Sequence, residues 1–217
     1  TIADGTEVQD AVIARSGITG EKMELDGYNF IEGDNVAVYD HMNKHLLCTM
    51  VQTNKPAEEQ AHAVAMQVAA MNPVALDEAS VPQEVKDTEL KVAIEKTKEE
   101  QVQKAVEAAL KKAGFNLYIA ENEEHLAEGI QKGNITEAQA EEIRQLKKTT
   151  AEQKAANLPE QMVMNIAKGR MAKFYKDSCL LNQEFIQDSK LSVSDYLKAA
   201  DKDLTVVAFK RFTLRAE

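Results

Sequence analysis

The spacing of apolar residues changes several times along this chain of 217 residues, and each change indicates a different element. Residues 6–16 carry apolar side chains at helical spacing, so they predict a short helix with Thr6 as its N-cap. Gly17 and Gly20 are expected to end this helix.

From residue 22 to residue 53 the apolar period falls to two, which is typical of strands with one buried face. The breaks in this stretch are short, so we expect a meander of three antiparallel strands. Residues 57–73 return to helical spacing with many alanines, which allow close packing on the sheet. Asn72-Pro73 is expected to end that helix.

A long charged region follows. Residues 82–113 and 135–156 have narrow apolar stripes between charged faces, and Thr136 is the expected N-cap of the second helix. Residues 115–133 predict a short apolar run and a short helix, and residues 158–176 predict a more apolar helix. We expect an antiparallel coiled-coil hairpin, because each stripe is too narrow for a helix buried on several sides. A single helix bundle is the alternative.

The end of the chain changes character again. Residues 179–188 are typical of extended chain, and either Ser192 or Ser194 is the expected N-cap of a short helix. Residues 205–217 alternate strongly, which predicts a final strand that returns to the sheet. The whole pattern predicts an α+β fold, in which a small antiparallel sheet packs with helices and a long helical hairpin projects.

Composition narrows the function classes. The formal net charge of −10 is unfavourable for broad contact with nucleic acid phosphates. No apolar run approaches the about 20 residues that cross a bilayer, and the first residues lack the regions of a signal peptide. Two cysteines and eight methionines fit a reducing cytosol, so we expect a cytoplasmic protein without disulfides or membrane contact.

The stretch AVYDHMNKHLLC concentrates the side chains that carry chemistry. On one strand His41 and His45 would lie about 13 Å apart, too far for two ligands of one zinc ion. A turn between them brings them closer, but no further zinc motif accompanies them. Cys48 has apolar neighbours, so we expect a buried structural cysteine that faces Tyr39 or its neighbours rather than His41.

The other candidates are also expected to be structural. His62 is predicted on a helix surface, His125 in a solvated acidic region, and Cys179 in a core beside two leucines. The sequence has no phosphate-binding, dinucleotide-binding or serine-hydrolase motif. The residues alone therefore predict a binding module with no catalytic residue, no cofactor and no metal.

Five segments then occur in a specific order. They are Gly20-Glu21-Lys22 before an alternating stretch, Glu32-Gly33-Asp34 followed by Tyr39-Asp40-His41, VAMQVAAMNP at 64–73, KGRMAKFYKDSCLLNQEFIQDSKLSVSDYLK at 168–198, and the closing VVAFKRFTLRAE. Together they resemble the bacterial elongation factor Ts family, from about residue 8 to the end of the chain.

The resemblance implies a guanine nucleotide exchange factor that binds elongation factor Tu and favours loss of Mg²⁺ and GDP, without enzymatic chemistry. Ts and GDP would then bind Tu with reciprocal antagonism. Carried over residue by residue, it implies contacts with Tu at Gly20, His41, Ile186, Gln187, Asp195, Tyr196 and Leu197. The structural alternatives are that Leu197 and Phe185 belong to the core and that His41 is ordinary surface.

The resemblance also implies three parts: residues 1–81 as the second half of the family's core domain, 82–168 as a hairpin with an insertion near 101–157, and 169–217 as the C-terminal module. The family's N-terminal Tu-binding domain and its T-D-F-V motif are unmatched, so it implies a fragment with weak binding and poor exchange. The competing hypothesis is a coiled-coil scaffold or dimerisation module that self-associates through the hairpin.

Overall fold

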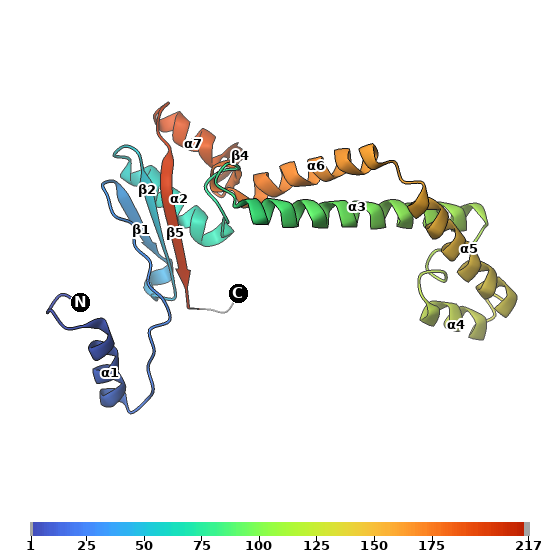
Figure 1. Ribbon diagram of the computed structural model, residues 1–217, viewed down its shortest axis with the longest axis horizontal. Coiled ribbons are helices and arrows are strands. Elements are labelled where there is room, and N and C mark those ends of the chain that lie inside the picture. The colour runs from blue at the N-terminus through green and yellow to red at the C-terminus, as the bar shows by residue number, and fades with distance from the viewer. Residues whose placement is uncertain (1, 215–217) are drawn as a thin grey trace. The chain divides into compact units, whose positions relative to one another are not determined.

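Two units make up the structure, a computed structural model in which residues 2–214 are described (Figure 1). The sheet unit comprises Thr1–Asn72 with Phe185–Glu217, and the helical unit comprises Pro73–Glu184. No helix within residues 2–214 combines the length and the apolar character that a membrane span requires. The three-part division implied by the resemblance stays a prediction.

The first helix, α1, spans Val8–Thr19, so the expected boundaries were wrong at both ends. Thr6 is not its N-cap, because the Thr6 amide is engaged in a local turn by Asp4 Oδ1 at 2.9 Å. Gly17 lies inside the helix, since a glycine weakens an exposed helix without forbidding it. Gly20 does end it, in left-handed conformation with φ of 72°.

Three antiparallel strands form the main sheet in the order β1-β2-β5. They are β1 (Val36–Asp40), β2 (Leu47–Thr53) and β5 (Val206–Thr213). The closing strand therefore returns to the sheet, as predicted, and it pairs with β2 from Leu47↔Thr213 to Thr53↔Val206.

The expected third strand of the meander, over residues 22–32, is absent from the structure. Gly27 in this segment lies against the aromatic ring of Phe212, so close that a Cβ there would be 2.7 Å from Phe212 Cε2. Leu25, Tyr28 and Phe30 are 61%, 78% and 60% exposed. The prediction was wrong because alternation describes an extended chain with two faces and does not supply a neighbouring strand.

Helix α2 spans Glu58–Met71 and covers one face of the sheet with small side chains. Its buried residues are Ala61, Ala63, Val64, Ala65, Gln67, Val68 and Ala69. The backbones come close enough for the Thr49 hydroxyl of β2 to donate to the Ala65 carbonyl at 2.8 Å. Asn72 adopts φ of 43° and ends the helix, as predicted.

The C-terminal part adds a second, two-stranded sheet and a short helix. The elements are β3 (Glu184–Phe185), β4 (Asp188–Ser192) and α7 (Val193–Ala200). Ser192 rather than Ser194 is the N-cap of α7, and it forms a capping box with Asp195.

In the helical unit, the long helix α3 packs along both α5 and α6 (Figure 1). The three helices span Gln83–Lys112, Glu137–Ala156 and Glu160–Ser178. Only Ala93, Thr97, Val106 and Leu110 of α3 are buried, which confirms the narrow stripe. Thr136 is the N-cap of α5 in a capping box with Gln139, as predicted.

Helix α4 (Glu123–Gln131) and the residues around it pack against the end of α3 and the start of α5 as a small helical subdomain. Its core consists of Val106, Leu110, Ala120, Leu126, Ala140 and Ile143. His125 is not solvated as expected: its side chain is 21% exposed and stacks on Tyr118 at 4.1 Å between ring centroids. The acidic sequence neighbours of His125 gave no indication that Tyr118 packs on its ring.

A further cluster of Ala75, Val81 and Cys179 lies where α6 ends, beside the short 3-10 helix η2 (Leu180–Asn182). Cys179 is completely buried, which confirms its prediction as a core residue.

Candidate partner-binding site

The turn between β1 and β2 is tight and held by Asp40. Residues 41–46 form it, beginning with the 3-10 helix η1 (His41–Asn43). Met42, Asn43 and His45 are left-handed, with φ of 59°, 53° and 56°. The Asp40 carboxylate accepts the His45 amide N–H at 3.0 Å, and its other oxygen contacts Nδ1 of the His45 ring. His45 is therefore part of the turn, and its ring faces Asp40.

His41 is exposed, and its ring is oriented by Tyr39. The Tyr39 hydroxyl and His41 Nδ1 are hydrogen-bonded at 2.9 Å. The Tyr39 ring packs edge-on against His62 of α2, with 5.7 Å between ring centroids. His62 is itself exposed, as predicted. A helix residue thus supports the tyrosine that positions His41 at the hairpin tip.

Cys48 is only half-buried, so the expectation of a buried cysteine was wrong. It lies on the sheet face away from α2, where β2 alternates half-buried residues with buried Thr49, Val51 and Thr53 on the other face. Its cross-strand partner on β1 is Asp40. Burial and the Asp40 carboxylate raise the pKa of the Cys48 thiol, which disfavours the nucleophilic thiolate.

The loop between β3 and β4 presents Ile186 and Gln187 at the surface. Ile186 is 45% exposed, and its amide N–H donates to the side chain of Gln67 at 2.8 Å. Gln67 belongs to α2 and is completely buried. Phe185, just before the loop, is 2% exposed and stacks on Tyr196 at 4.0 Å, so it belongs to the core.

The three residues singled out on α7 have different surroundings. Asp195 is exposed and closes the capping box, where the Ser192 hydroxyl lowers the pKa of its carboxyl. Tyr196 is half-buried. Its burial is the larger cause, and the negative charge of Glu59 the smaller cause, of the raised pKa of its hydroxyl. Leu197 is completely buried, so its side chain stabilises the unit from within.

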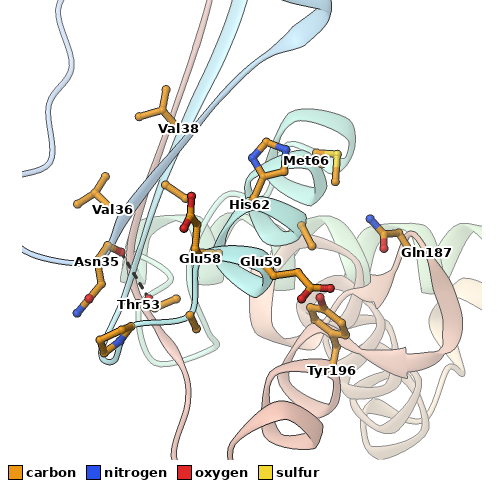
Figure 2. Close-up of a pocket in the computed structure, with 15 residues that line it drawn as sticks. Asn35, Val36, Val38, Thr53, Glu58, Glu59, His62, Met66, Gln187 and Tyr196 are labelled. Atoms are coloured by element: carbon orange, nitrogen blue, oxygen red, sulfur yellow. Dashed lines mark hydrogen bonds between the residues drawn. The ribbon is translucent and has the colours of Figure 1, made fainter.

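A groove of about 990 Å³ in the sheet unit joins two of these regions. Figure 2 shows Val36 and Val38 of β1 on one side, Glu58 and His62 of α2 in the middle, and Gln187 and Tyr196 on the other side. The Glu59 carboxylate points toward the Tyr196 hydroxyl (Figure 2). Gln187 and Tyr196 are thus brought together along one surface.

Gly20 stands apart from this arrangement. It caps α1 through its amide N–H, which donates to the Ser16 carbonyl at 2.9 Å. A Cβ at Gly20 would meet no atom within 4 Å, so its role in this structure is the left-handed turn itself.

Gln67 is a supporting residue that the sequence reasoning did not single out, whereas Tyr39 was predicted as a neighbour of Cys48 and His62 as a residue of the helix surface. Tyr39 and Gln67 each hold a predicted contact residue by a hydrogen bond. The one available signal was a glutamine on the apolar side of a helix of alanines and valines, since a buried amide needs a partner. Within residues 2–214, no group of three or more His, Cys, Asp or Glu side chains is arranged to hold a metal ion.

The chain matches the family described as "Elongation factor TS" over residues 1–216. It is similar to the elongation factor Ts of Phocaeicola vulgatus, with 58% identity over 216 residues that cover all of this chain and 65% of that protein. The elongation factor Ts of Parabacteroides distasonis is 57% identical over 97% of this chain and 64% of its own length. That of Porphyromonas gingivalis is 35% identical over all of this chain and 58% of its own length.

This chain therefore spans less than two thirds of the length of each of these three relatives. The family match runs from one end of the chain almost to the other, and it includes the first four segments on which the resemblance was based and all but the last residue of the fifth. The prediction of the family is confirmed, and the chain belongs to the elongation factor Ts family.

Proposed function

We propose that this chain is a translation elongation factor segment that binds elongation factor Tu and promotes exchange of GDP for GTP, without enzymatic chemistry, in the cytoplasm. The observation that carries the proposal is the family match over residues 1–216. Because the chain spans 64–65% of two close relatives, the activity of the whole proteins is a proposal for these residues. We expect binding to Tu and slower exchange than a whole relative gives.

Two surfaces of the sheet unit support binding to Tu. The hairpin tip offers His41, whose Nδ1 is engaged by Tyr39. With Nδ1 engaged, Nε2 is the ring nitrogen that can bond with a partner. The loop after β3 offers the apolar side chain of Ile186 on a backbone fixed by Gln67. Both side chains are exposed, and hydrogen bonds from Tyr39 and Gln67 hold the two residues in place. This limits the conformational entropy that they lose on binding.

Exchange requires only that the chain and GDP bind Tu antagonistically. If the chain weakens GDP binding by a given factor, GDP weakens binding of the chain by the same factor. The contribution of this chain is then its affinity for the form of Tu that has lost the nucleotide. The acidic net charge of −10 gives no support to direct nucleic acid binding.

Gel filtration with nucleotide-free Tu tests the binding. We expect a complex that the double variant His41→Ala with Ile186→Ala weakens at least about tenfold, which corresponds to about 1.4 kcal/mol. Leu197 and Asp195 are unsuitable for this test, because one is buried and the other caps α7. The control is Val74→Ala with Met164→Ala, which removes exposed apolar side chains of the helical unit.

The scaffold hypothesis has no observation in its favour. The apolar stripe of α3 is buried against α5 and α6 of the same chain. Ala93, Thr97, Val106 and Leu110 are at most 6% exposed, so these side chains do not face solvent where a second copy would meet them.

A further inference from the structure

Strand β1 lies at the edge of the main sheet, with β2 as its neighbour on one side. An edge strand offers backbone N–H and C=O groups to any extended chain that can reach them. The question is which groups of β1 face outward and what lies beside them.

The register identifies these groups. The Thr53 amide N–H donates to the Asn35 carbonyl at 3.1 Å, and the β1–β2 pairing continues from there. Hydrogen-bonded and non-hydrogen-bonded pairs alternate in an antiparallel ladder. The backbone N–H and C=O groups of Ala37 and Tyr39 therefore point toward β2. Those of Val36, Val38 and Asp40 point toward the open edge.

The other side of β2 agrees with this assignment. The Leu214 amide N–H donates to the Leu46 carbonyl at 2.9 Å, so even-numbered residues of β2 face β5. The backbone groups of odd-numbered β2 residues then point toward β1, in agreement with the hydrogen bond from the Thr53 amide to the Asn35 carbonyl.

The groove described above lies along this open edge. Val36 and Val38 border it from β1, with their side chains on the sheet face away from α2, and α2 contributes His62 and Met66 (Figure 2). Val38 is 60% exposed, although strand valines usually pack against a neighbour. A strand edge beside a helix, with a groove between them, is the arrangement that binds extended peptides by strand addition.

Charge specifies the occupant further. Glu58 and Glu59 line the groove and are exposed, and the 15 described residues that line it include no lysine or arginine. The nearby cation Lys55 is paired with Asp201 at 2.9 Å and with Asp203 at 3.6 Å. The groove is therefore acidic, and a basic residue on the bound chain would complement it.

We infer that the open edge of β1 beside α2 binds an extended segment of a partner protein as an added strand. Its side chains alternate between the two faces of the sheet, so that apolar side chains lie beside Val38 on the face away from α2 and a lysine or arginine lies over α2, opposite Glu58 and Glu59. This site goes beyond the proposed exchange function and does not depend on it. The chain's own segment 22–32 does not fill the edge, since its Gly27 lies against Phe212 of β5, the strand at the other edge.

The probe is a short synthetic peptide that alternates valine with lysine, capped at both ends, titrated into the ¹⁵N-labelled chain. We expect the amide signals of Val36, Val38 and Asp40 to shift and their hydrogen exchange to slow. Val38→Pro removes a donor that β2 does not use, so it should weaken peptide binding at least about tenfold while the sheet persists. Val38→Ala keeps the donor and is the matched control.

A second variant tests the charge without touching the strand. Glu58→Gln with Glu59→Gln should weaken binding of the lysine peptide, whereas Glu124→Gln on α4 should leave it unchanged. A peptide with glutamate in place of lysine should not bind.

Any one of four results would overturn the inference. Two concern binding: no binding at millimolar peptide, and equal binding to the Val38→Pro and Val38→Ala chains. Two concern the NMR signals: shifts that map away from β1 and α2, and amides of Val36 and Val38 that are already protected from exchange without peptide.

Discussion

Gln67 is a polar residue with no exposed surface on a helix of alanines and valines, and its side chain fixes a loop 119 positions away in the sequence. Its Oε1 accepts the Ile186 amide N–H at 2.8 Å. The position of the exposed Ile186 thus depends on Gln67, which is buried and cannot contact a partner itself.

Gln67→Met, which keeps the length of the side chain and removes the acceptor, should lower the free energy of unfolding by about 1–2 kcal/mol. It should also speed hydrogen exchange at the Ile186 amide, because that donor loses its bond. Thermal unfolding and exchange by NMR measure the two effects. Gln60→Met on the same helix is the control, and unchanged exchange at Ile186 would show that the bond does not hold the loop.

The capping box of α7 gives a second prediction at this scale. Ser192→Ala should lower the free energy of unfolding by about 1 kcal/mol, because the N-cap hydroxyl satisfies the Asp195 amide. Ser194→Ala should have a smaller effect, since Ser194 is not the cap. Equal losses in the two variants, measured by urea unfolding, would contradict the assignment.

The same box sets a pH dependence. The Ser192 hydroxyl lowers the folded-state pKa of Asp195, so this carboxylate contributes stability at pH values above its unfolded pKa, near 3.8. That contribution is lost as the pH falls through the folded-state pKa. From about pH 5 to about pH 3, the parent chain should therefore lose more stability than Ser192→Ala.

Local signals of this kind were predictable from the sequence. Ser192, Thr136 and Asn72 end or begin helices because of chemistry within a few residues. The bond from Ile186 to Gln67 and the stacking of His125 on Tyr118 were not predictable, since each depends on where tertiary packing places a second side chain.

At the scale of elements, helices were predicted better than strands. The stripe of α3 was visible because helical spacing alone defines a face. Residues 22–32 alternate as a strand does but make no ladder, because pairing needs a second chain segment at hydrogen-bonding distance. The closing strand β5 has such a neighbour in β2.

Two helical glycines give opposite predictions. At Gly129 of α4, a Cβ would lie 2.9 Å from Ile119 Cγ2 and 3.2 Å from Ile135 Cγ1, whereas at Gly169 of α6 it would meet nothing within 4 Å. Gly129→Ala should therefore destabilise the subdomain by about 1–3 kcal/mol. Gly169→Ala should stabilise its helix by about 0.5–1 kcal/mol. Thermal unfolding distinguishes them, and the same sign for both would contradict the packing around α4.

For the whole molecule, burial of the α3 stripe within one chain predicts a monomer. Light scattering over a concentration series should give a constant mass of 24.0 kDa. Leu110→Ala should destabilise the chain by about 2–5 kcal/mol without changing that mass, since Leu110 is 3% exposed in the subdomain core. A mass that rises with concentration would revive the scaffold hypothesis.

The family, the α+β class and the return of the closing strand to the sheet were predictable because they depend on patterns spread over many residues. The candidate site was predicted less evenly. His41 and Ile186 are exposed, whereas Leu197 is buried and Asp195 serves as a cap. Sequence resemblance proposes segments for contact with a partner, and only the packing shows which of their side chains face outward.

Release of a fluorescent GDP analogue from elongation factor Tu, followed in the presence of increasing amounts of this chain, tests the central claim most directly. We predict that the release rate rises with chain concentration, reaches a lower plateau than with the Phocaeicola vulgatus factor, and falls back in the His41→Ala, Ile186→Ala double variant. A release rate that stays at its intrinsic value up to about 50 µM chain, where a complex with Kd below about 10 µM would be mostly formed, would contradict it.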